Sequence, residues 1–348
     1  MTDLTTTPQA QLIQRQAIGR KANEFASNAV FVSYQLDKSK NTLARHGRDL
    51  DKFAECLTEV GAAVTGDSLM SDPQAWQGIT WGMVDMFKKW LFNKGYALST
   101  VNGCLSTVRI YAELAFNAGM IDQSDYLRIK AIKNIKQRAD EKRSVSRVGD
   151  KKATAVILYE RDAKLLIAEA YSKPTPAAMR DAAIMCLLLD HGLRASEVAA
   201  LTVGCIDLEN ETLTFERPKV KGTQHETGRH ILTPRSLYHL KAYMEFAPSF
   251  AHEPLFRTSD KSGSLGDGSL TRITVSRLVN RIATRAAEKH GLNKLTSLSA
   301  HDCRHYCATT MANKNYGVHE LMNWFGWTSA QTAMRYVEAA EVAERDKG

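Results

Sequence analysis

A strongly basic, polar segment near the middle of the chain separates two blocks of apolar periodicity, and this separation most constrains the fold. Between residues 128 and 152 the sequence has ten basic and three acidic side chains. A single hydrophobic core rarely grows beyond about 250–300 residues, so a chain of 348 residues with such an interruption predicts two domains. We predict an extension over residues 1–37, a helical domain over 38–135, a basic linker over 136–155, a second domain over 156–340 and a tail over 341–348.

The charge of this segment indicates the class of partner. It carries +7 of the chain's net charge of +8, and such a band is the electrostatic footprint of a nucleic-acid-binding protein. A solvated linker that binds nothing is the alternative. The basic residues of the segment are Arg128, Lys130, Lys133, Lys136, Arg138, Lys142, Arg143, Arg147, Lys151 and Lys152.

The composition also indicates where the protein works. The chain has no run of about 18 apolar residues and begins without the basic and apolar regions of a signal peptide. Its six cysteines form no Cys-x-x-Cys pair, which favours free buried thiols in a reducing compartment. We therefore expect a cytoplasmic protein without a membrane span.

The first block predicts a compact helical domain. Apolar residues recur at helical spacing after Ser39, after Asp72-Pro73 and after Ser99, and Ser, Thr and Asp are favoured helix starts. A short fourth helix is predicted near residues 124–132, and residues 1–37 predict an N-terminal helix.

The second block mixes helices with a little β-structure. We predict strands over residues 211–215 and 228–232 that pair across a loop. Residues 258–269 are rich in Gly, Ser and Asp and predict a mobile loop. The predicted fold class is therefore mostly α with a small β-sheet (α+β). The predicted helices cover residues 159–170, 177–191, 235–246, 271–289, 301–315, 318–325 and 329–340.

Five side chains in the second block have the chemistry to attack a phosphodiester. Arg194 and Arg304 carry planar guanidinium forks that grip phosphate oxygens, and Tyr336 can act as a covalent nucleophile. His301 lies three residues before Arg304, so one helical face presents both, and Trp327 adds an indole N–H.

Some of these residues also have a simpler interpretation. Arg194 and Glu197 can form a plain helical ion pair, and Trp327 can be a core residue. His301, Cys303, His305 and Cys307 alternate as metal ligands might, but residues two apart diverge on a helix and no second ligand cluster is evident.

The order and spacing of these residues resemble the tyrosine recombinases, or phage integrase family. The resemblance rests on Gly192-Leu193-Arg194-Ala195-Ser196-Glu197, His301-Asp302-Cys303-Arg304-His305, Gly326-Trp327-Thr328 and Met334-Arg335-Tyr336-Val337. In the helical block, Asn41-Thr42-Leu43 and Leu98-Ser99-Thr100-Val101 look like the family's core-binding domain. The chain departs from most members at Trp327, where histidine is commoner; the Cre branch has tryptophan there.

This resemblance implies a fold and a role for each residue. It implies a SAM-like core-binding domain and a catalytic domain that form a C-shaped DNA clamp. Tyr336 is then the nucleophile, and Arg194, His301, Arg304 and Trp327 act on the phosphate or the nucleophile's proton. Glu197 orients its neighbours and His305 supports the site by packing. The family's general acid is a hairpin lysine, which is Lys221 here, with Lys219 as the alternative.

The resemblance further implies a site-specific DNA recombinase that works through a 3′-phosphotyrosine and a Holliday junction, with no metal and no cofactor. Its partner is double-stranded DNA carrying recombination sites. The protein would form a homo-tetramer on paired sites and a monomer or weak dimer in free solution, associated with the nucleoid of a bacterium, or encoded by a phage or other mobile element. The alternatives are a type IB topoisomerase and a non-catalytic DNA-binding relative.

Basic residues outside the chemistry are candidates for contacts with DNA. Residues 271–289 form a predicted helix whose arginines can enter a major groove. The candidates are Arg45, Arg48, Arg109, Lys133, Lys136, Arg138, Lys142, Arg143, Arg272, Arg277 and Arg281.

Overall fold

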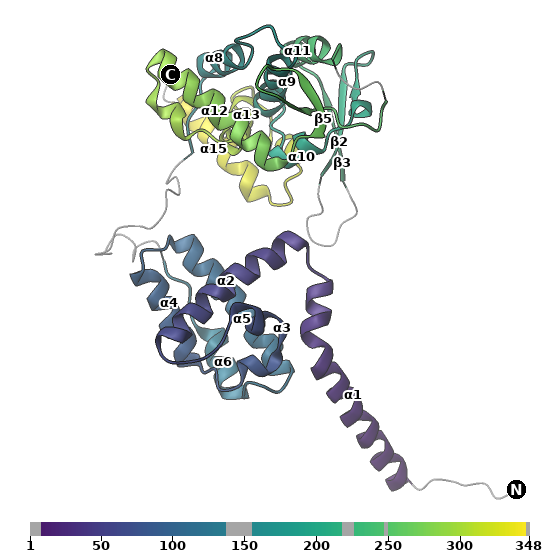
Figure 1. Cartoon of the computed structure of the whole chain (residues 1–348), viewed down its shortest axis with the longest axis vertical. Helices are drawn as coiled ribbons and strands as arrows, with labels where there is room; N and C mark the ends of the chain where they lie inside the picture. Colours follow the sequence, from purple (N-terminus) through teal and green to yellow (C-terminus); the bar gives the residue numbers. More distant parts are fainter. Residues whose placement is uncertain (1–7, 137–154, 218–225, 247–249, 346–348) are drawn as a thin grey trace, which may run out of the picture. The chain divides into compact units, whose positions relative to one another are not determined.

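The computed structural model describes residues 8–136, 155–217, 226–246 and 250–345, and the chain divides into two compact units (Figure 1). The first unit spans Met1–Lys151 and the second Lys152–Gly348. The described residues are mostly helical with small β-sheets, which confirms the predicted fold class. In the described ranges, none of the helices combines the length and apolar composition that crossing a bilayer needs.

The first unit is a bundle of helices around one apolar core. Phe53, Trp76, Phe87 and Tyr111 lie at its centre with almost no exposed surface. Ser39 caps α2 as predicted, because its side chain accepts a hydrogen bond from the Thr42 amide. The elements are α1 (Pro8–Leu36), α2 (Lys40–Glu59), α3 (Gly66–Ser71), η1 (Pro73–Trp76), α4 (Trp81–Asn93), α5 (Leu98–Asn117) and α6 (Gln123–Ala131).

One helix start in this unit was predicted wrongly. Asp72-Pro73 opens only the short 3-10 turn η1, and the long helix α4 begins at Trp81. Gly78 between them has a φ of 79°, a left-handed conformation that interrupts the helix. The short helix α3 was not predicted.

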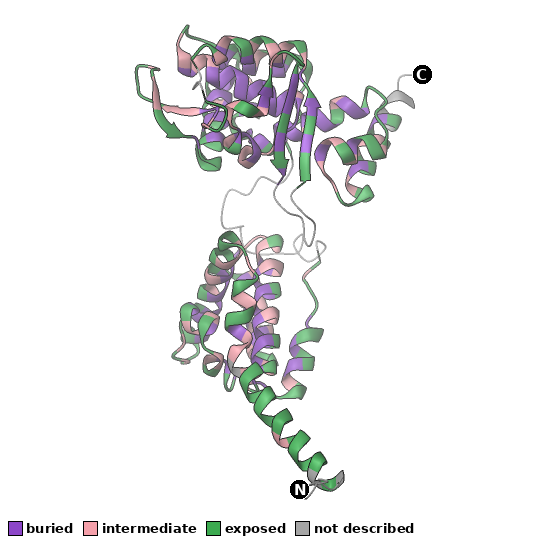
Figure 2. Ribbon diagram, turned by 90° about the vertical axis from the view of Figure 1, so that its right-hand side faces the viewer, coloured by how far each residue is buried: buried purple, intermediate pink, exposed green. Residues whose placement is uncertain are grey.

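The second unit combines helices with a three-stranded sheet and a two-stranded sheet. Helix α9 runs through its centre: every residue from Ala182 to Leu189 is buried, and Figure 2 shows how buried residues gather inside the unit. Its elements are α8 (Glu160–Ala170), α9 (Pro176–Asp190), α10 (Ala195–Ala200), η2 (Val203–Cys205), β1 (Ile206–Asp207), β2 (Thr212–Arg217), β3 (Glu226–Ile231), α11 (Pro234–Met244), β4 (Arg257–Ser259), β5 (Leu265–Ser269), α12 (Arg272–His290), η3 (Asn293–Ser297), α13 (Ala300–Ala312), α14 (Val318–Phe325) and α15 (Ala330–Arg345).

The predicted strand pair is confirmed. Strands β2 and β3 pair antiparallel from Thr212 opposite Ile231 to Arg217 opposite Glu226, and β1 adds to the other edge of β2. The predicted loop over residues 258–269 is wrong, because β4 and β5 form a second antiparallel hairpin there. The Asp260 carboxylate accepts the amides of Ser262, Gly263 and Ser264, and this side-chain turn closes the hairpin.

A second, smaller core lies at the C-terminal end of the unit. It joins α13, α14 and α15 and is separate from the large core around α9. Its buried residues are Cys307, Ala308, Met311, Ala312, Leu321, Phe325, Ala333 and Ala340.

Candidate active site

Arg194 is held at the start of a short helix. The chain leaves α9, turns at Gly192 with a φ of 62°, and Arg194 then becomes the N-cap of α10. The buried Glu197 carboxylate accepts both the Arg194 backbone amide at 2.7 Å and its Nη1 at 2.6 Å. The predicted ion pair therefore exists, and it leaves 37 % of the Arg194 side chain exposed.

Arg304 lies on α13 and is almost completely buried, with 6 % of its surface exposed. Nη1 donates to the Gly192 carbonyl at 2.6 Å and Nη2 to the Phe325 carbonyl at 2.5 Å. A guanidinium has five N–H groups, so this clamp leaves donors for a ligand. Burial, helped by the positive charges of Arg194 and Arg217, lowers the pKa of Arg304 to about 10, and Arg304 stays charged at neutral pH.

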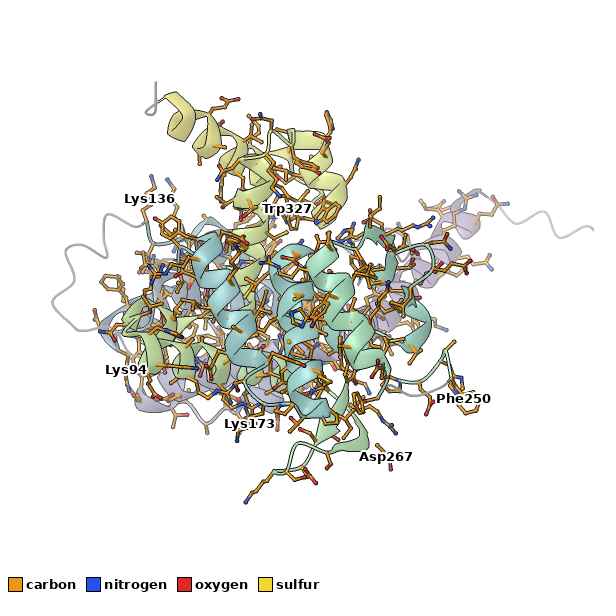
Figure 3. The ribbon with its side chains drawn as sticks, turned by 90° about the horizontal axis from the view of Figure 1, so that it is seen from above. Lys94, Lys136, Lys173, Phe250, Asp267 and Trp327 are labelled. Atoms are coloured by element: carbon orange, nitrogen blue, oxygen red, sulfur yellow. The ribbon has the colours of Figure 1, made fainter. Side chains whose placement is uncertain are left out.

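A cavity of about 390 Å³ brings together four of the six predicted catalytic residues, His301, Arg304, Trp327 and Tyr336. Arg194 is not among the residues that line this cavity. His301, Arg304 and His305 reach it from α13, as their spacing on one helical face predicts. Trp327 lies in the turn after α14, and Figure 3 labels it beside the C-terminal helices. The remaining lining residues, from α15, are Thr332, Arg335 and Tyr336.

Tyr336 is half-buried between an indole and an imidazole. Its ring stacks on Trp327 with centroids 5.3 Å apart and an angle of 8° between the planes. Its hydroxyl makes a short hydrogen bond with His305 Nδ1. Burial raises the pKa of Tyr336, although Arg304 and Arg335 act to lower it. At neutral pH the Tyr336 hydroxyl therefore keeps its proton unless an acceptor takes it.

The two histidines of α13 have different positions. His305, for which the sequence predicts a packing role, contacts the Tyr336 hydroxyl. His301, for which the resemblance implies proton transfer or a phosphate contact, lies beside His305 with ring centroids 4.5 Å apart. Both remain candidates, and the geometry gives His305 the shorter path to the nucleophile's proton.

The hairpin lysines lie outside the described residues, because β2 ends at Arg217 and β3 begins at Glu226. Lys221 and Lys219 therefore stay predictions. The same holds for Arg138, Lys142 and Arg143 in the basic segment.

The alternating His and Cys residues of α13 do not converge. Cys303 and Cys307 are buried, and Cys307 Sγ contacts the Asp190 carbonyl at 3.2 Å, whereas His301 is exposed. Among the residues that the structure describes, no three His, Cys, Asp or Glu side chains are grouped to hold a metal.

Three residues at or beside the site were missed by the sequence analysis. Thr332 and Arg335 line the cavity, and the charge of Arg335 next to Tyr336 was the available signal. Arg217 at the end of β2 is buried and donates to the Asn323 and Trp324 carbonyls. No local pattern marks Arg217, because these partners are more than 100 residues away.

The predicted DNA-contact residues on α12 differ in the contacts that the structure gives them. On α12, Arg272 and Arg277 are exposed and line a shallow groove with Ile273, Ser276 and Asn280. Arg281 instead forms an ion pair with Asp181 at 3.4 Å.

In the first unit, Lys133 and Lys136 are exposed, as are Arg45 and Arg48 of α2. Arg109 is half-buried and donates to Asn134 Oδ1 at 3.1 Å. Its pKa is lowered by burial. Arg109 is therefore the candidate least available for DNA in this unit.

Comparison with known proteins identifies the family of the chain. The sequence model of the phage integrase family matches residues 157–342. The tyrosine recombinase XerC of Roseiflexus castenholzii is 27 % identical over 308 residues, which cover 86 % of this chain and 83 % of that protein.

Two solved structures have a similar fold. The integrase of the transposon Tn1549, in complex with transposon right end DNA, aligns with a TM-score of 0.60 and 14 % identity, covering 92 % of this chain and 98 % of that one. A lambda integrase dimer bound to a core site aligns with a TM-score of 0.51 and 17 % identity, covering 86 % and 81 %. Because the family's sequence model spans more than half of the chain and includes every residue that lines the cavity, the chain belongs to the phage integrase family.

Proposed function

We propose that this protein is a site-specific DNA recombinase of the tyrosine class, which cleaves and rejoins DNA strands through Tyr336. The observation that carries the proposal is the convergence of the Tyr336 hydroxyl, a histidine, an indole and a buried arginine in one cavity. A nucleophile, a base for its proton and a cation for the phosphate are the groups that phosphoryl transfer needs.

In the first step, Tyr336 Oη attacks the scissile phosphorus and its proton passes to His305 Nδ1. This direction requires the His305 tautomer that carries its hydrogen on Nε2. The new P–Oη bond forms as the bond to the 5′ oxygen breaks. The leaving oxygen takes a proton from Lys221, or from Lys219 as the alternative, and the products are a 3′-phosphotyrosine and a free 5′ hydroxyl.

The arginines act on the charge that grows at the phosphate. Arg304 and Arg194 donate to the non-bridging oxygens, with His301 and the Trp327 indole N–H as further donors. Because Arg304 is already fixed by two backbone carbonyls, little reorganisation is needed when the charge develops. Glu197 holds Arg194 in place.

The second step reverses the first on a different strand. The 5′ hydroxyl of the partner strand attacks the phosphotyrosine, tyrosine leaves and recovers its proton, and a new phosphodiester forms. One phosphodiester is made for each one broken, so the energy of the bond stays in the covalent intermediate. Two such exchanges pass through a Holliday junction.

This cycle calls for two paired sites and hence an assembly. We infer a homo-tetramer on paired double-stranded sites and a monomer or weak dimer without DNA, with the two units forming the predicted clamp. The exposed Arg272 and Arg277 of α12 would contact the duplex, together with exposed basic residues of the first unit. A nucleoid-associated protein of a bacterium, phage or mobile element fits this function.

The test is covalent trapping on nicked DNA carrying candidate element ends, for the wild type and Tyr336→Phe. Tyr316→Phe is the matched control, because Tyr316 is exposed and lies outside the cavity. We expect an adduct for the wild type and for Tyr316→Phe, and none for Tyr336→Phe. An adduct that survives Tyr336→Phe would contradict the proposal.

Relaxation of supercoiled plasmid without any site would favour a topoisomerase. Specific DNA binding without any adduct would favour a non-catalytic relative.

A further inference from the structure

Arg217 is a buried charge that the proposed chemistry does not use. It is the last residue of β2, and only 5 % of its surface is exposed. Its one ion-pair partner in the described structure is the exposed Glu226, with Nη1 3.5 Å from Oε1. Burying a cation is costly unless its hydrogen bonds are satisfied, so the position of Arg217 requires an explanation.

The guanidinium of Arg217 caps the end of α14. Nη1 donates to the Asn323 carbonyl at 3.1 Å and Nη2 to the Trp324 carbonyl at 2.5 Å. The last carbonyls of a helix have no partner within it, and they carry the negative end of the helix dipole. His230 Nε2 also contacts the Trp324 carbonyl at 3.0 Å, and its ring stacks on the Trp324 indole. Strands β2 and β3 thus hold the C-terminus of α14.

The capped turn leads directly into the active site. Gly326 ends α14 with a φ of 60°, and the next residue is Trp327. A Cβ on Gly326 would lie 2.7 Å from Arg217 Cδ, so the turn and the arginine side chain are packed against each other. The Trp327 amide donates to the Met322 carbonyl at 3.0 Å, and this hydrogen bond fixes the backbone position from which the indole side chain extends.

The same turn connects Arg217 to Arg304. Three successive carbonyls, of Asn323, Trp324 and Phe325, accept hydrogen bonds from the two arginines: Arg217 takes the first two and Arg304 the third. Displacement of the first two carbonyls would therefore move both the third and the indole that stacks on Tyr336.

We propose that Arg217 is a positioning residue that sets Trp327 against Tyr336 by capping α14 from the sheet. This inference rests on the proposed roles of Trp327 and Tyr336. Arg217 does not line the cavity, and its loss acts on the chemical step through the turn at Gly326.

The first test is a double-variant cycle on the single-turnover rate of adduct formation at saturating DNA. Arg217→Lys keeps a charge but reaches fewer carbonyls, and Trp327→Phe keeps a ring for stacking but removes the N–H. We expect Arg217→Lys to slow the wild type by on the order of 10- to 100-fold, the effect of a small misplacement, with unchanged DNA affinity. In the Trp327→Phe background the same substitution should slow the reaction less than in the wild type, because only the part that acts through the indole N–H is lost and the part that acts through the Phe325 carbonyl and Arg304 remains. Equal effects in both backgrounds would overturn the proposal.

The matched control is Arg257→Gln, which removes an arginine of the same unit that pairs with the exposed Asp267. Its rate should equal that of the wild type. If Arg257→Gln slows the reaction as much as Arg217→Lys, a general effect of replacing an arginine in this unit and not the capping of α14 is responsible, and the proposal is overturned.

The second test does not depend on activity. The five tryptophans give five indole N–H signals in a ¹⁵N spectrum, and three of them, Trp76, Trp81 and Trp90, belong to the first unit. Arg217→Lys should shift the signals of Trp324 and Trp327 and leave those three in place. An unmoved Trp327 signal would overturn the proposal. If the wild type forms no Tyr336-dependent adduct, the proposed function fails, and this spectrum still decides whether Arg217 positions the indole.

Discussion

Arg304 and Tyr336 face the same cavity but are held in different ways. Arg304 is clamped by carbonyls at the ends of α9 and α14 and is 6 % exposed. Tyr336 lies on α15, whose buried apolar residues in the described structure are two alanines, Ala333 and Ala340. Apolar burial stabilises in proportion to area, about 25 cal/mol per Å². Two buried alanines and the partly buried Tyr336 and Val337 therefore give α15 less apolar stabilisation than the buried residues of α9 give that helix. Arg304 is therefore preorganised, and we expect Tyr336 to lie on the less stable element.

The largest expected difference between the two sides is in what their loss does to folding. Arg304→Ala should abolish adduct formation and lower the free energy of unfolding by about 3–5 kcal/mol, because several buried groups lose their partner. Tyr336→Phe should also abolish the adduct but lower that free energy by only about 1 kcal/mol, for one lost hydrogen bond. Urea unfolding of both variants measures this. An equal loss of the free energy of unfolding in the two variants would contradict this difference between Arg304 and Tyr336.

The next effect concerns the proton of Tyr336. His305→Asn should slow adduct formation by about 10²- to 10⁴-fold, the contribution of general acid–base catalysis. His301→Asn should slow it less, because His301 does not contact the hydroxyl. Single-turnover rates for both variants at saturating DNA test this, and a larger loss for His301→Asn would return the proton role to that residue.

Hydrogen exchange measures the difference in local stability directly. Amides of α15 should exchange through local opening at a lower free energy than amides of α9, whose residues 182–189 are all buried. Peptide-resolved exchange of the free protein provides the measurement. Equal protection of α9 and α15 would mean that the nucleophile is as firmly held as the arginines.

A further predicted effect is a loss of stability in acid. Burial lowers the pKa of His191 to about 4 and that of His230 to about 3, from an ordinary value of 6.5. The unfolded chain takes up these protons near pH 6.5 and the folded chain only at lower pH. The stability of the fold is therefore complete above pH 6.5 and falls as the pH decreases towards 4.

His230→Phe keeps an aromatic ring beside Trp324 and removes one of these titrations. Its free energy of unfolding should depend less on pH between 6.5 and 4 than that of the wild type. His319→Gln is the control, because His319 is exposed. If the free energy of unfolding of both variants depends on pH as that of the wild type does, His230 does not contribute to the loss of stability in acid.

The sequence predicts those parts of this molecule that depend on short-range patterns. The β2–β3 pair follows from alternating residues, and His301 and Arg304 share a face because helical spacing puts them there. The prediction at Asp72-Pro73 was wrong because these residues do start a helix, but a glycine soon interrupts it. The prediction for residues 258–269 was wrong because the Asp260 turn that joins the two strands has the composition of a loop.

Contacts between distant elements are not predictable in this way. Which histidine reaches Tyr336 depends on how α15 packs on α13, since His301 and His305 are one turn apart on the same face. The partners of Arg217 lie 106 and 107 residues further along the chain, so no window of sequence contains the cap of α14.

The most direct measurement is to identify the residue that carries the DNA. The covalent adduct is trapped on nicked DNA, digested with protease and nuclease, and the modified peptide is sequenced by mass spectrometry. We predict a nucleotide phosphate on Tyr336, in the peptide that contains Met334-Arg335-Tyr336-Val337. The same modification on another tyrosine, or on a residue outside the cavity, would contradict the account.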